Sequence, residues 1–216
     1  MTWDSAYRTD KYIWGEKPSE LAVFACNYLL KYDTGEKEPS ILDVGCGYGR
    51  DSVFLARNIR CKVLDIDNAE EAIEMARKTS IDDLNSRVGF RCCDFTQMTG
   101  VEFDIVFVSN LYQILENKDR HSLRDMVRIS LKRGGKLFLS TLSTSDPEHF
   151  GKGTRVQSED NSYIEGKFLH FCTREEIERD FNFLSITELH EHEYDEPRSN
   201  METHHHISWM LIGIKR

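Results

Sequence analysis

The segment Ile41-Leu42-Asp43-Val44-Gly45-Cys46-Gly47-Tyr48-Gly49-Arg50 joins a short apolar run to three glycines at alternate positions. A helical-looking run, residues 51–57, follows it. A strand that turns through glycines into a helix brings bare backbone N–H groups, at the positive end of the helix dipole, against a ligand. We therefore predict a ligand-binding turn at residues 45–49.

The glycine spacing favours one class of ligand. A dinucleotide-binding turn reads G-x-G-x-x-G, but here Arg50 stands where the third glycine would fall. A P-loop ends in Gly-Lys-Ser or Gly-Lys-Thr, and the sequence contains neither tripeptide. The carboxylate of Asp43 would repel a pyrophosphate and attract an ammonium group. S-adenosylmethionine carries an ammonium, a sulfonium and no phosphate, so the turn predicts this cofactor, with S-adenosylhomocysteine as its product.

Composition bounds the other possibilities. The 216 residues, 39% of them hydrophobic, suit one well-buried α/β domain. The net charge of -9 argues against a nucleic-acid partner. Six cysteines without C-x-x-C spacing indicate reduced thiols. Without a signal-peptide core or an apolar run of membrane-spanning length, we expect a cytoplasmic protein with no membrane partner. The oligomeric state stays open.

Hydrophobic periodicity and turn signals place the secondary structure. Five strands are predicted at residues 41–44, 61–66, 87–92, 103–108 and 136–141. Helices are predicted from Pro18, at 50–57, after a capping box of Asn68 and Glu71, and around 123–131 with an end at Gly134-Gly135. Residues 143–166 are predicted as a long loop, and Thr173 as the cap of a helix over 174–181. Two strands, 183–193 and 207–215, are predicted to form an antiparallel hairpin.

The glycine turn, the acids after the second and third strands and the terminal hairpin resemble the Rossmann-like, class I S-adenosylmethionine-dependent methyltransferases. The resemblance implies a Rossmann-like doubly wound α/β sheet, mostly parallel, with a C-terminal antiparallel hairpin. In a single domain, residues 1–35 would form a helical cover, 36–142 the cofactor-binding core and 143–216 the acceptor side. Shorter segments resemble the tellurite-resistance and thiopurine methyltransferase branch: residues 12–18, 151–153 and 171–176.

The implied activity is methyl transfer by in-line displacement to a small-molecule acceptor. Thiols, metalloids or chalcogens, and heteroaromatic compounds are the acceptor classes that we expect. The alternative is a protein that senses S-adenosylmethionine or binds a partner without turnover.

Acids at strand ends mark the expected cofactor site. Asp67 ends the second strand, where a carboxylate accepts hydrogen bonds from ribose hydroxyls, or merely begins a helix; Asp65 lies inside that strand rather than at its end. The resemblance implies that Asp94 bonds the adenine amino group and that Phe95 lies against the ring; the alternative is a surface turn. Trp14 either covers the cofactor or belongs to the core. The expected cofactor-binding residues are Trp14, Asp43, Gly45, Cys46, Gly47, Gly49, Asp67, Asn68, Asp94, Phe95 and Asn110.

Histidines dominate the expected acceptor side, because an alcohol or amine acceptor needs a base and histidine titrates near neutral pH. An antiparallel last strand would bring His190, His192, His204, His205 and His206 towards the cofactor, with His205 on the opposite face from its two neighbours. They could be solvated, hold the acceptor or, least expected, ligate a metal. We select His205 and His170 as catalytic candidates and expect no metal site. The glycine-bearing loop 146–162 is expected to close over the acceptor.

Overall fold

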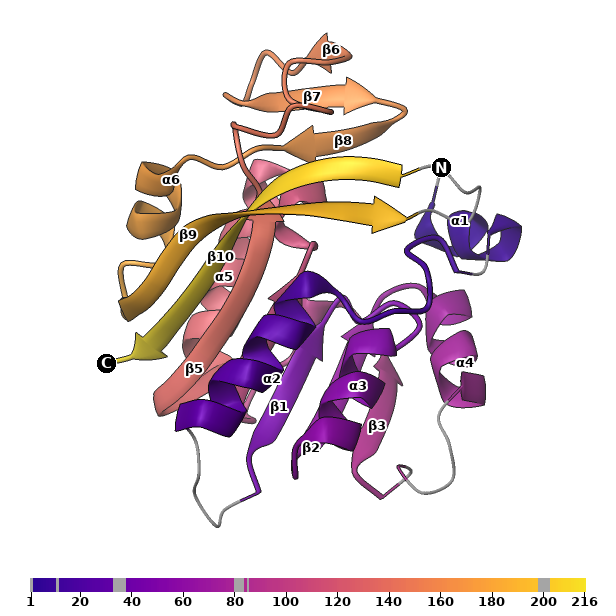
Figure 1. Ribbon diagram of the computed structural model, residues 1–216, viewed down its shortest axis with the longest axis vertical. Helices are drawn as coiled ribbons and strands as arrows, with labels where there is room; N and C mark the ends of the chain where they lie inside the picture. The colour runs from indigo at the N-terminus through magenta and orange to yellow at the C-terminus, as the bar shows by residue number, and fades with distance from the viewer. Residues whose placement is uncertain (1, 11, 33–37, 80–83, 85, 198–202) are drawn as a thin grey trace.

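A seven-stranded sheet with helices on both faces forms the body of the molecule (Figure 1). The computed structural model describes residues 2–10, 12–32, 38–79, 84, 86–197 and 203–216. The strand order is β3-β2-β1-β4-β5-β10-β9, and β10 runs antiparallel to the other six strands. The predicted fold class, a Rossmann-like doubly wound sheet with a C-terminal antiparallel hairpin, is confirmed.

The elements follow the predicted order. The main sheet comprises β1 (Ser40–Val44), β2 (Lys62–Asp67), β3 (Val88–Cys92), β4 (Phe103–Ser109), β5 (Leu131–Leu142), β9 (Leu184–Pro197) and β10 (Thr203–Lys215). A small second sheet comprises β6 (Thr154–Arg155), β7 (Ser162–Glu165) and β8 (Lys167–His170). The helices are α1 (Trp3–Thr9), α2 (Glu20–Tyr32), α3 (Arg50–Asn58), α4 (Glu70–Thr79), α5 (Asn117–Ser130) and α6 (Arg174–Asp180), with short 3-10 turns η1 (Phe95–Gln97) and η2 (Tyr112–Ile114).

Alternate residues of each central strand feed two separate apolar cores. In β1, Ile41 packs with α2 and α3 on one face, whereas Leu42 and Val44 pack with α5 and α6 on the other. Figure 1 shows α2 and α3 in front of the sheet and α5 behind it. Burial on both faces explains why the parallel strands read as continuous apolar runs in the sequence.

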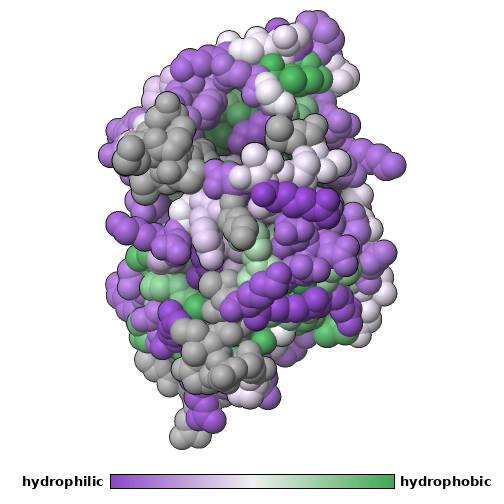
Figure 2. Space-filling view, turned by 90° about the vertical axis from the view of Figure 1, so that its right-hand side faces the viewer, coloured by the Kyte–Doolittle hydropathy of each residue, from purple (hydrophilic) through white to green (hydrophobic). Residues whose placement is uncertain are grey.

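The terminal hairpin completes one side of the sheet. Trp209 of β10 pairs with Thr141 of β5 and with Glu191 of β9, which confirms the predicted antiparallel arrangement. Residues 198–202, within the expected connection, lie outside the described residues, as does the expected boundary at 35/36. None of the described helices is long and apolar enough to cross a membrane. Hydrophilic residues cover much of the face shown in Figure 2.

The helix predicted to end at Gly134-Gly135 ends earlier, at Ser130. Leu131 leaves the helix with an extended backbone, is fully buried and pairs with Phe103 at the start of β5. The two glycines instead shape an irregularity in β5: a Cβ at Gly135 would lie 2.8 Å from the carbonyl oxygen of Lys132. Burial of one more leucine in the sheet therefore outweighs the local glycine signal.

Carboxylates replace one expected feature of the fold and add a contact that was not predicted. The capping box of Asn68 and Glu71 is wrong, because the N–H of Glu71 donates to Oδ1 of Asp4 in α1 (3.1 Å). Nearby strands are fastened by Asp104 of β4, which accepts from the N–H of Ser40 (3.0 Å) and pairs with the ammonium of Lys132 (2.9 Å). These contacts cross between segments distant in sequence, which local patterns do not reveal.

The loop predicted at residues 143–166 is also wrong in part, because it contains strands of the small antiparallel sheet. Thr154 pairs with Ile164, and Tyr163 pairs with Leu169 across the turn at Gly166. The strands are short and several of their side chains are exposed, so they lack the apolar signature of a sheet. The predicted cap of α6 is confirmed, since Oγ1 of Thr173 accepts from the N–H of Glu176 (3.2 Å).

Candidate functional site

The glycine turn has the geometry that its sequence predicts. Gly45, Gly47 and Gly49 all have positive φ angles, between 55° and 76°, in the left-handed region that disfavours side chains. A Cβ at Gly47 would lie 2.8 Å from the hydroxyl of Tyr7, and one at Gly49 would lie 2.9 Å from the ring of Phe90. The glycines therefore let the chain turn tightly into α3. Their N–H groups are not bare as expected, because those of Gly45, Gly47 and Gly49 donate to Ile66, Asp67 and Cys46.

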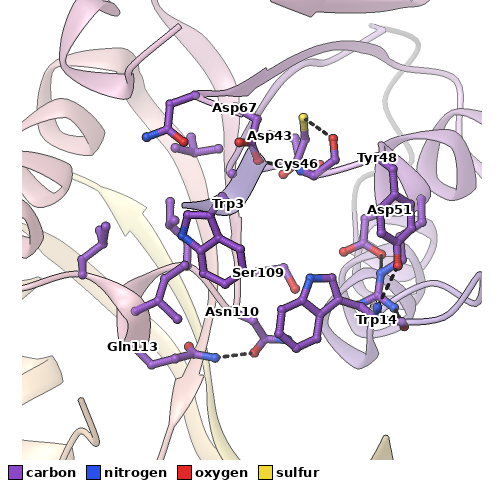
Figure 3. Close-up of a pocket in the computed structure, with 18 of the residues that line it drawn as sticks. Trp3, Trp14, Asp43, Cys46, Tyr48, Asp51, Asp67, Ser109, Asn110 and Gln113 are labelled. Atoms are coloured by element: carbon purple, nitrogen blue, oxygen red, sulfur yellow. Dashed lines mark hydrogen bonds and ion pairs between the residues drawn. The ribbon is translucent and has the colours of Figure 1, made fainter. Parts of the chain in front are cut away.

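One pocket lies over this turn, with walls from the strand ends, the N-terminal segment and the start of β10 (Figure 3). Most of the expected cofactor-binding residues line it: Trp14, Asp43, Gly45, Cys46, Gly47, Asp67, Asn68, Phe95 and Asn110. Gly49 and Asp94 are not among its described lining residues. Gly49 instead packs the start of α3 against β3, and Asp94 begins η1 by accepting from the N–H of Thr96 (2.8 Å).

Asp67 fastens the glycine turn to the end of β2. Its Oδ2 accepts from the N–H of Gly47 and its Oδ1 from the N–H of Ala69, each at 2.9 Å. Burial raises the pKa of Asp67, and these two backbone hydrogen bonds counter part of that rise. A carboxylate has about four acceptor positions, so a ligand hydroxyl can share these oxygens with the backbone.

Two further aspartates lie side by side beneath the turn. Asp43 of β1 is in register with Asp65 of β2, and its Oδ2 accepts from the hydroxyl of Ser52 (2.9 Å). Burial, followed by the charge of Asp51, raises the pKa of Asp43 well above its ordinary range. Burial and the charge of Asp43 do the same to the pKa of Asp65, whose carboxyl oxygens have no hydrogen-bond partner among the described residues. Of the two, Asp43 lines the pocket.

Asn110 adopts a strained conformation where β4 meets the pocket. Its φ angle of 54° is uncommon for a residue with a side chain. Its N–H lies 3.2 Å from Oγ of Ser140, and its Oδ1 accepts from the side-chain amide of Gln113 (3.3 Å). The strand end is thus held in a shape that turns it towards the glycine turn.

The N-terminal segment covers the pocket and is tied to the glycine turn. The N–H of Trp14 donates to the hydroxyl of Tyr48 (3.2 Å), which donates to the carbonyl oxygen of Gly15 (2.5 Å). The guanidinium of Arg50 also donates to the carbonyl oxygen of Trp14. The Trp14 ring faces the rest of the pocket near Trp3, as Figure 3 shows. Arg50, which replaces the third glycine of a dinucleotide turn, therefore anchors the cover.

The histidines of the hairpin do not all reach the pocket. His206 is buried, lines the pocket and has its Nδ1 3.1 Å from Oδ2 of Asp146. His205 points to the other face, as alternation predicts, and bonds Asp195 through Nδ1 (2.9 Å), which raises the pKa of His205. His190 packs its ring against Phe24. His205 is absent from the described lining of the pocket, so the structure separates this catalytic candidate from the cofactor site.

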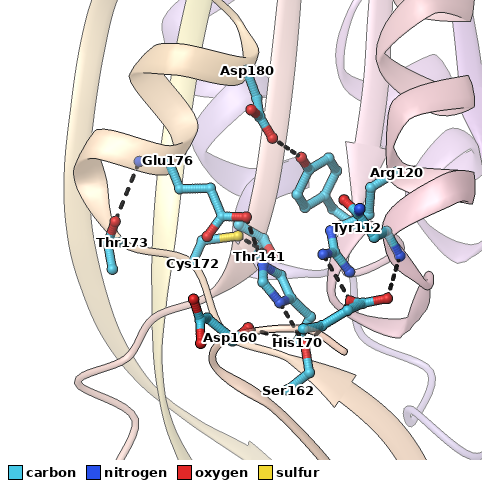
Figure 4. A network of polar contacts seen from close by, with 12 residues as sticks. Tyr112, Arg120, Thr141, Asp160, Ser162, His170, Cys172, Thr173, Glu176 and Asp180 are labelled. Atoms are coloured by element: carbon cyan, nitrogen blue, oxygen red, sulfur yellow. Dashed lines mark hydrogen bonds and ion pairs between the residues drawn. The ribbon is translucent and has the colours of Figure 1, made fainter. Parts of the chain in front are cut away.

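His170, the second catalytic candidate, belongs to a buried network outside the pocket (Figure 4). Its Nδ1 lies 2.9 Å from the hydroxyl of Ser162, and its Nε2 lies 2.9 Å from Oε1 of Glu176. The pair Arg120–Glu159 (3.0 Å) lies beside it. These contacts fasten the small sheet to α5 and α6, so the described surroundings of His170 are those of a structural residue.

One lining histidine escaped the sequence analysis. His149 lies in the segment between β5 and β6, and its N–H donates to Oδ1 of Asp146 (2.8 Å). Burial, then the charge of His206, lowers the pKa of His149. The one local signal for this position is Asp146, three residues earlier, because an aspartate often begins a tight turn. Its Oδ1 accepts from the N–H groups of Glu148 and His149.

Comparisons with known proteins agree with this geometry. Residues 41–135 match the family described as a methyltransferase domain. Sterol 24-C-methyltransferase from Kluyveromyces lactis is 32% identical over 114 residues, which are 52% of this chain and 30% of that protein. Carboxy-S-adenosyl-L-methionine synthase from Shewanella sediminis is 28% identical over 131 residues, 59% of this chain and 51% of that protein. The chain thus spans about half the length, or less, of these curated relatives.

Solved structures share the fold over most of the chain. A SAM-dependent methyltransferase from Methanosarcina mazei superimposes with a TM-score of 0.72 and 19% identity, covering 86% of this chain and 96% of that one. TehB from Haemophilus influenzae superimposes with a TM-score of 0.65 and 15% identity, covering 90% of this chain and 61% of that one. The solved structures thus share the Rossmann-like fold of this chain, and within it residues 41–135 match the family described as a methyltransferase domain.

Proposed function

We propose that this protein transfers the methyl group of S-adenosylmethionine to a small-molecule acceptor. One observation carries the proposal: the positive-φ glycine turn, the buried Asp43 and the turn-bound carboxylate of Asp67 meet at a single pocket. The turn lets a ligand approach a backbone without side chains, and the two acids offer charge and hydrogen-bond acceptors to a cationic, ribose-bearing ligand.

Each part of the cofactor has a matching group in the pocket. The ribose hydroxyls would donate to the oxygens of Asp67, and the ammonium group would lie near Asp43. The adenine ring would lie against Phe95, which η1 holds in place through Asp94. An ammonium beside Asp43 favours the ionised carboxylate, because an opposite charge offsets the effect of burial on the pKa.

The reaction itself needs alignment more than acid–base chemistry. The acceptor's lone pair forms a bond to the methyl carbon as the bond from that carbon to the sulfonium sulfur breaks, and the electron pair passes to sulfur. The protein's contribution is to hold the two partners in line and to exclude water. The tryptophans of the N-terminal cover, Trp3 and Trp14, are placed to serve the second purpose.

The acceptor side favours a small, soft or flat acceptor. Aliphatic side chains line it: Ile114, Leu115, Leu142 and Leu169. Polar groups beside them include the imidazoles of His149 and His206 and the ammonium of Lys167, and Glu196 adds a negative charge. Apolar walls favour uncharged acceptors, so thiols, heteroaromatic compounds and neutral metalloids fit better than charged oxyanions.

Transfer of tritium from methyl-labelled S-adenosylmethionine tests this function directly. The purified protein is incubated with a panel of aromatic thiols, heteroaromatic amines and metalloid or chalcogen compounds, and extracted product is counted. We expect label in one acceptor class and its loss with Asp67→Asn. Saturable binding of the cofactor without labelling of any acceptor would contradict the proposed methyl transfer. It would favour the alternative, a protein that senses S-adenosylmethionine without turnover.

A further inference from the structure

Three histidines form a cluster at the acceptor side of the pocket: His149, His204 and His206. Each offers one ring nitrogen, and these nitrogens all lie within 4.8 Å of one another. The ring centres are 5.4 to 6.0 Å apart. His204 and His206 share a face at the start of β10, and His149 reaches them from the segment before β6. Two of the three, His149 and His206, line the pocket.

A carboxylate lies beside Nδ1 of each of the two histidines on β10. Oδ2 of Asp146 lies 3.1 Å from Nδ1 of His206, and Oε1 of Glu148 lies 3.0 Å from Nδ1 of His204. In His206 the hydrogen bond to Asp146 fixes the tautomer and leaves Nε2 as the ligand atom, which is the usual surrounding of metal-bound histidines, and Glu148 places a negative charge beside His204.

The same acids fix the position of the third histidine. Asp146 accepts from the N–H of His149 (2.8 Å) and from the N–H of Ile207 on β10 (3.1 Å). Glu148 accepts from the N–H of His205 (2.7 Å). The segment that carries His149 is therefore fastened to β10, so the cluster joins two elements that are held together independently of the rings.

We propose that His149, His204 and His206 bind a divalent transition-metal ion of the zinc class beside the cofactor pocket. Three imidazoles are a common ligand set for catalytic zinc, in which the fourth position stays open for water or substrate. Glu196, with Oε2 3.7 Å from Nε2 of His206, adds a negative charge that favours a cation. The site was not predicted from the sequence, because the two histidines of β10 form only an i, i+2 pair and the third ligand comes from another element.

The open position suggests which acceptor the ion would hold, and this step rests on the proposed methyl transfer. A thiol that coordinates zinc loses its proton to solvent and binds as the thiolate. The thiolate sulfur then forms the new bond to the methyl carbon while the sulfonium–carbon bond breaks. The ion would thereby select a thiol among the acceptor classes considered above.

A second group, His170, Cys172 and Glu176, also brings three possible ligands together. Its histidine already bonds Ser162 and Glu176 through its two nitrogens, at 2.9 Å each, and it lies outside the described lining of the pocket. This buried group therefore serves as a comparison and not as a second proposed site.

Titration of the chelator-treated protein with Co²⁺, a coloured substitute for Zn²⁺, tests the site through its visible absorption. We expect one equivalent to bind with the bands of four-coordinate cobalt, and His206→Ala and His149→Ala to weaken binding at least about tenfold. His205→Ala, on the same strand but outside the cluster, should bind like the wild type. Circular dichroism shows whether each variant is folded. If the His206→Ala variant on β10 misfolds, His149→Ala still tests the site, because His149 lies in a connecting segment outside the sheet.

Three results would overturn the metal site: no stoichiometric cobalt binding, equal binding by folded His149→Ala and wild type, or loss of the bands only in His170→Ala. Equal thiol methylation before and after metal removal would overturn the role of the ion in thiol activation. Cobalt binding without methylation of any acceptor would support the metal site and contradict the proposed function, so the two failures are distinguishable.

Discussion

Replacement of Asp67 by asparagine probes the cofactor site at the residue that joins the glycine turn to β2. The carboxylate accepts one backbone N–H on each oxygen, from Gly47 and from Ala69. An amide keeps a single acceptor oxygen, so one of these N–H groups meets an NH₂ group in either orientation of the amide. A ribose hydroxyl also loses a charged acceptor.

The expected loss follows from these contacts. A hydrogen bond to a charged group contributes about 1.5–3 kcal/mol, against about 1 kcal/mol for a neutral one. Asp67→Asn should therefore weaken binding of S-adenosylhomocysteine by about 1–3 kcal/mol, or about 5- to 150-fold. The orphaned backbone N–H should also lower the free energy of unfolding of the unliganded protein by about 1–3 kcal/mol.

Titration calorimetry measures the affinity, and urea denaturation measures the stability of the free protein. Asp104→Asn is the matched control, because it makes the same change at a carboxylate that also accepts a backbone N–H but lies in β4 and does not line the pocket. We expect its affinity to stay within about twofold of the wild type. Unchanged affinity in Asp67→Asn, or an equal loss in both variants, would refute the assignment of Asp67 to the ribose.

Binding of S-adenosylhomocysteine should strengthen as the pH rises from the ordinary range of an aspartate towards neutrality, and should release protons in calorimetry, because the raised pKa of Asp43 falls beside an ammonium group. Asp43→Asn should abolish the effect. In urea denaturation Gly49→Ala should cost about 2–4 kcal/mol, for its left-handed backbone and close contact, whereas Gly100→Ala, with open space, should cost only about 1–2 kcal/mol. Burial alone would raise the pKa of Asp104, but its hydrogen bonds and the Lys132 ammonium hold it below its ordinary range. Asp104→Asn should therefore lose about 1–2 kcal/mol at pH 7, a difference that shrinks as the pH falls below about 4.

The parallel half of the fold was predictable because its signals are local. Apolar runs, glycine turns and capping residues occur within a few positions of the elements that they define, and β1, α3 and α6 begin within one residue of their predicted starts. The glycine turn and Asp67 were predictable for the same reason, since both occur at strand ends. The sequence therefore predicted most of the residues that line the pocket beside the glycine turn.

The remaining features depend on contacts between distant segments. Asp4, 67 residues before Glu71 in the chain, takes the capping role predicted for Asn68. Leu131 joins the sheet because a buried site in β5 receives it, and the short strands β6–β8 exist because they pair with one another. His149 reaches the pocket through the turn at Asp146. No periodicity marks such contacts, which is why the acceptor side was predicted less well.

Competition between two ligands tests the central claim, that the glycine turn binds a sulfonium cofactor. S-adenosylmethionine is titrated into the protein by calorimetry, with and without saturating S-adenosylhomocysteine, and NAD⁺ is titrated in parallel. We predict saturable one-to-one binding of S-adenosylmethionine that its product abolishes, and no heat from NAD⁺. Tight binding of NAD⁺ with no response to either sulfur compound would contradict the account.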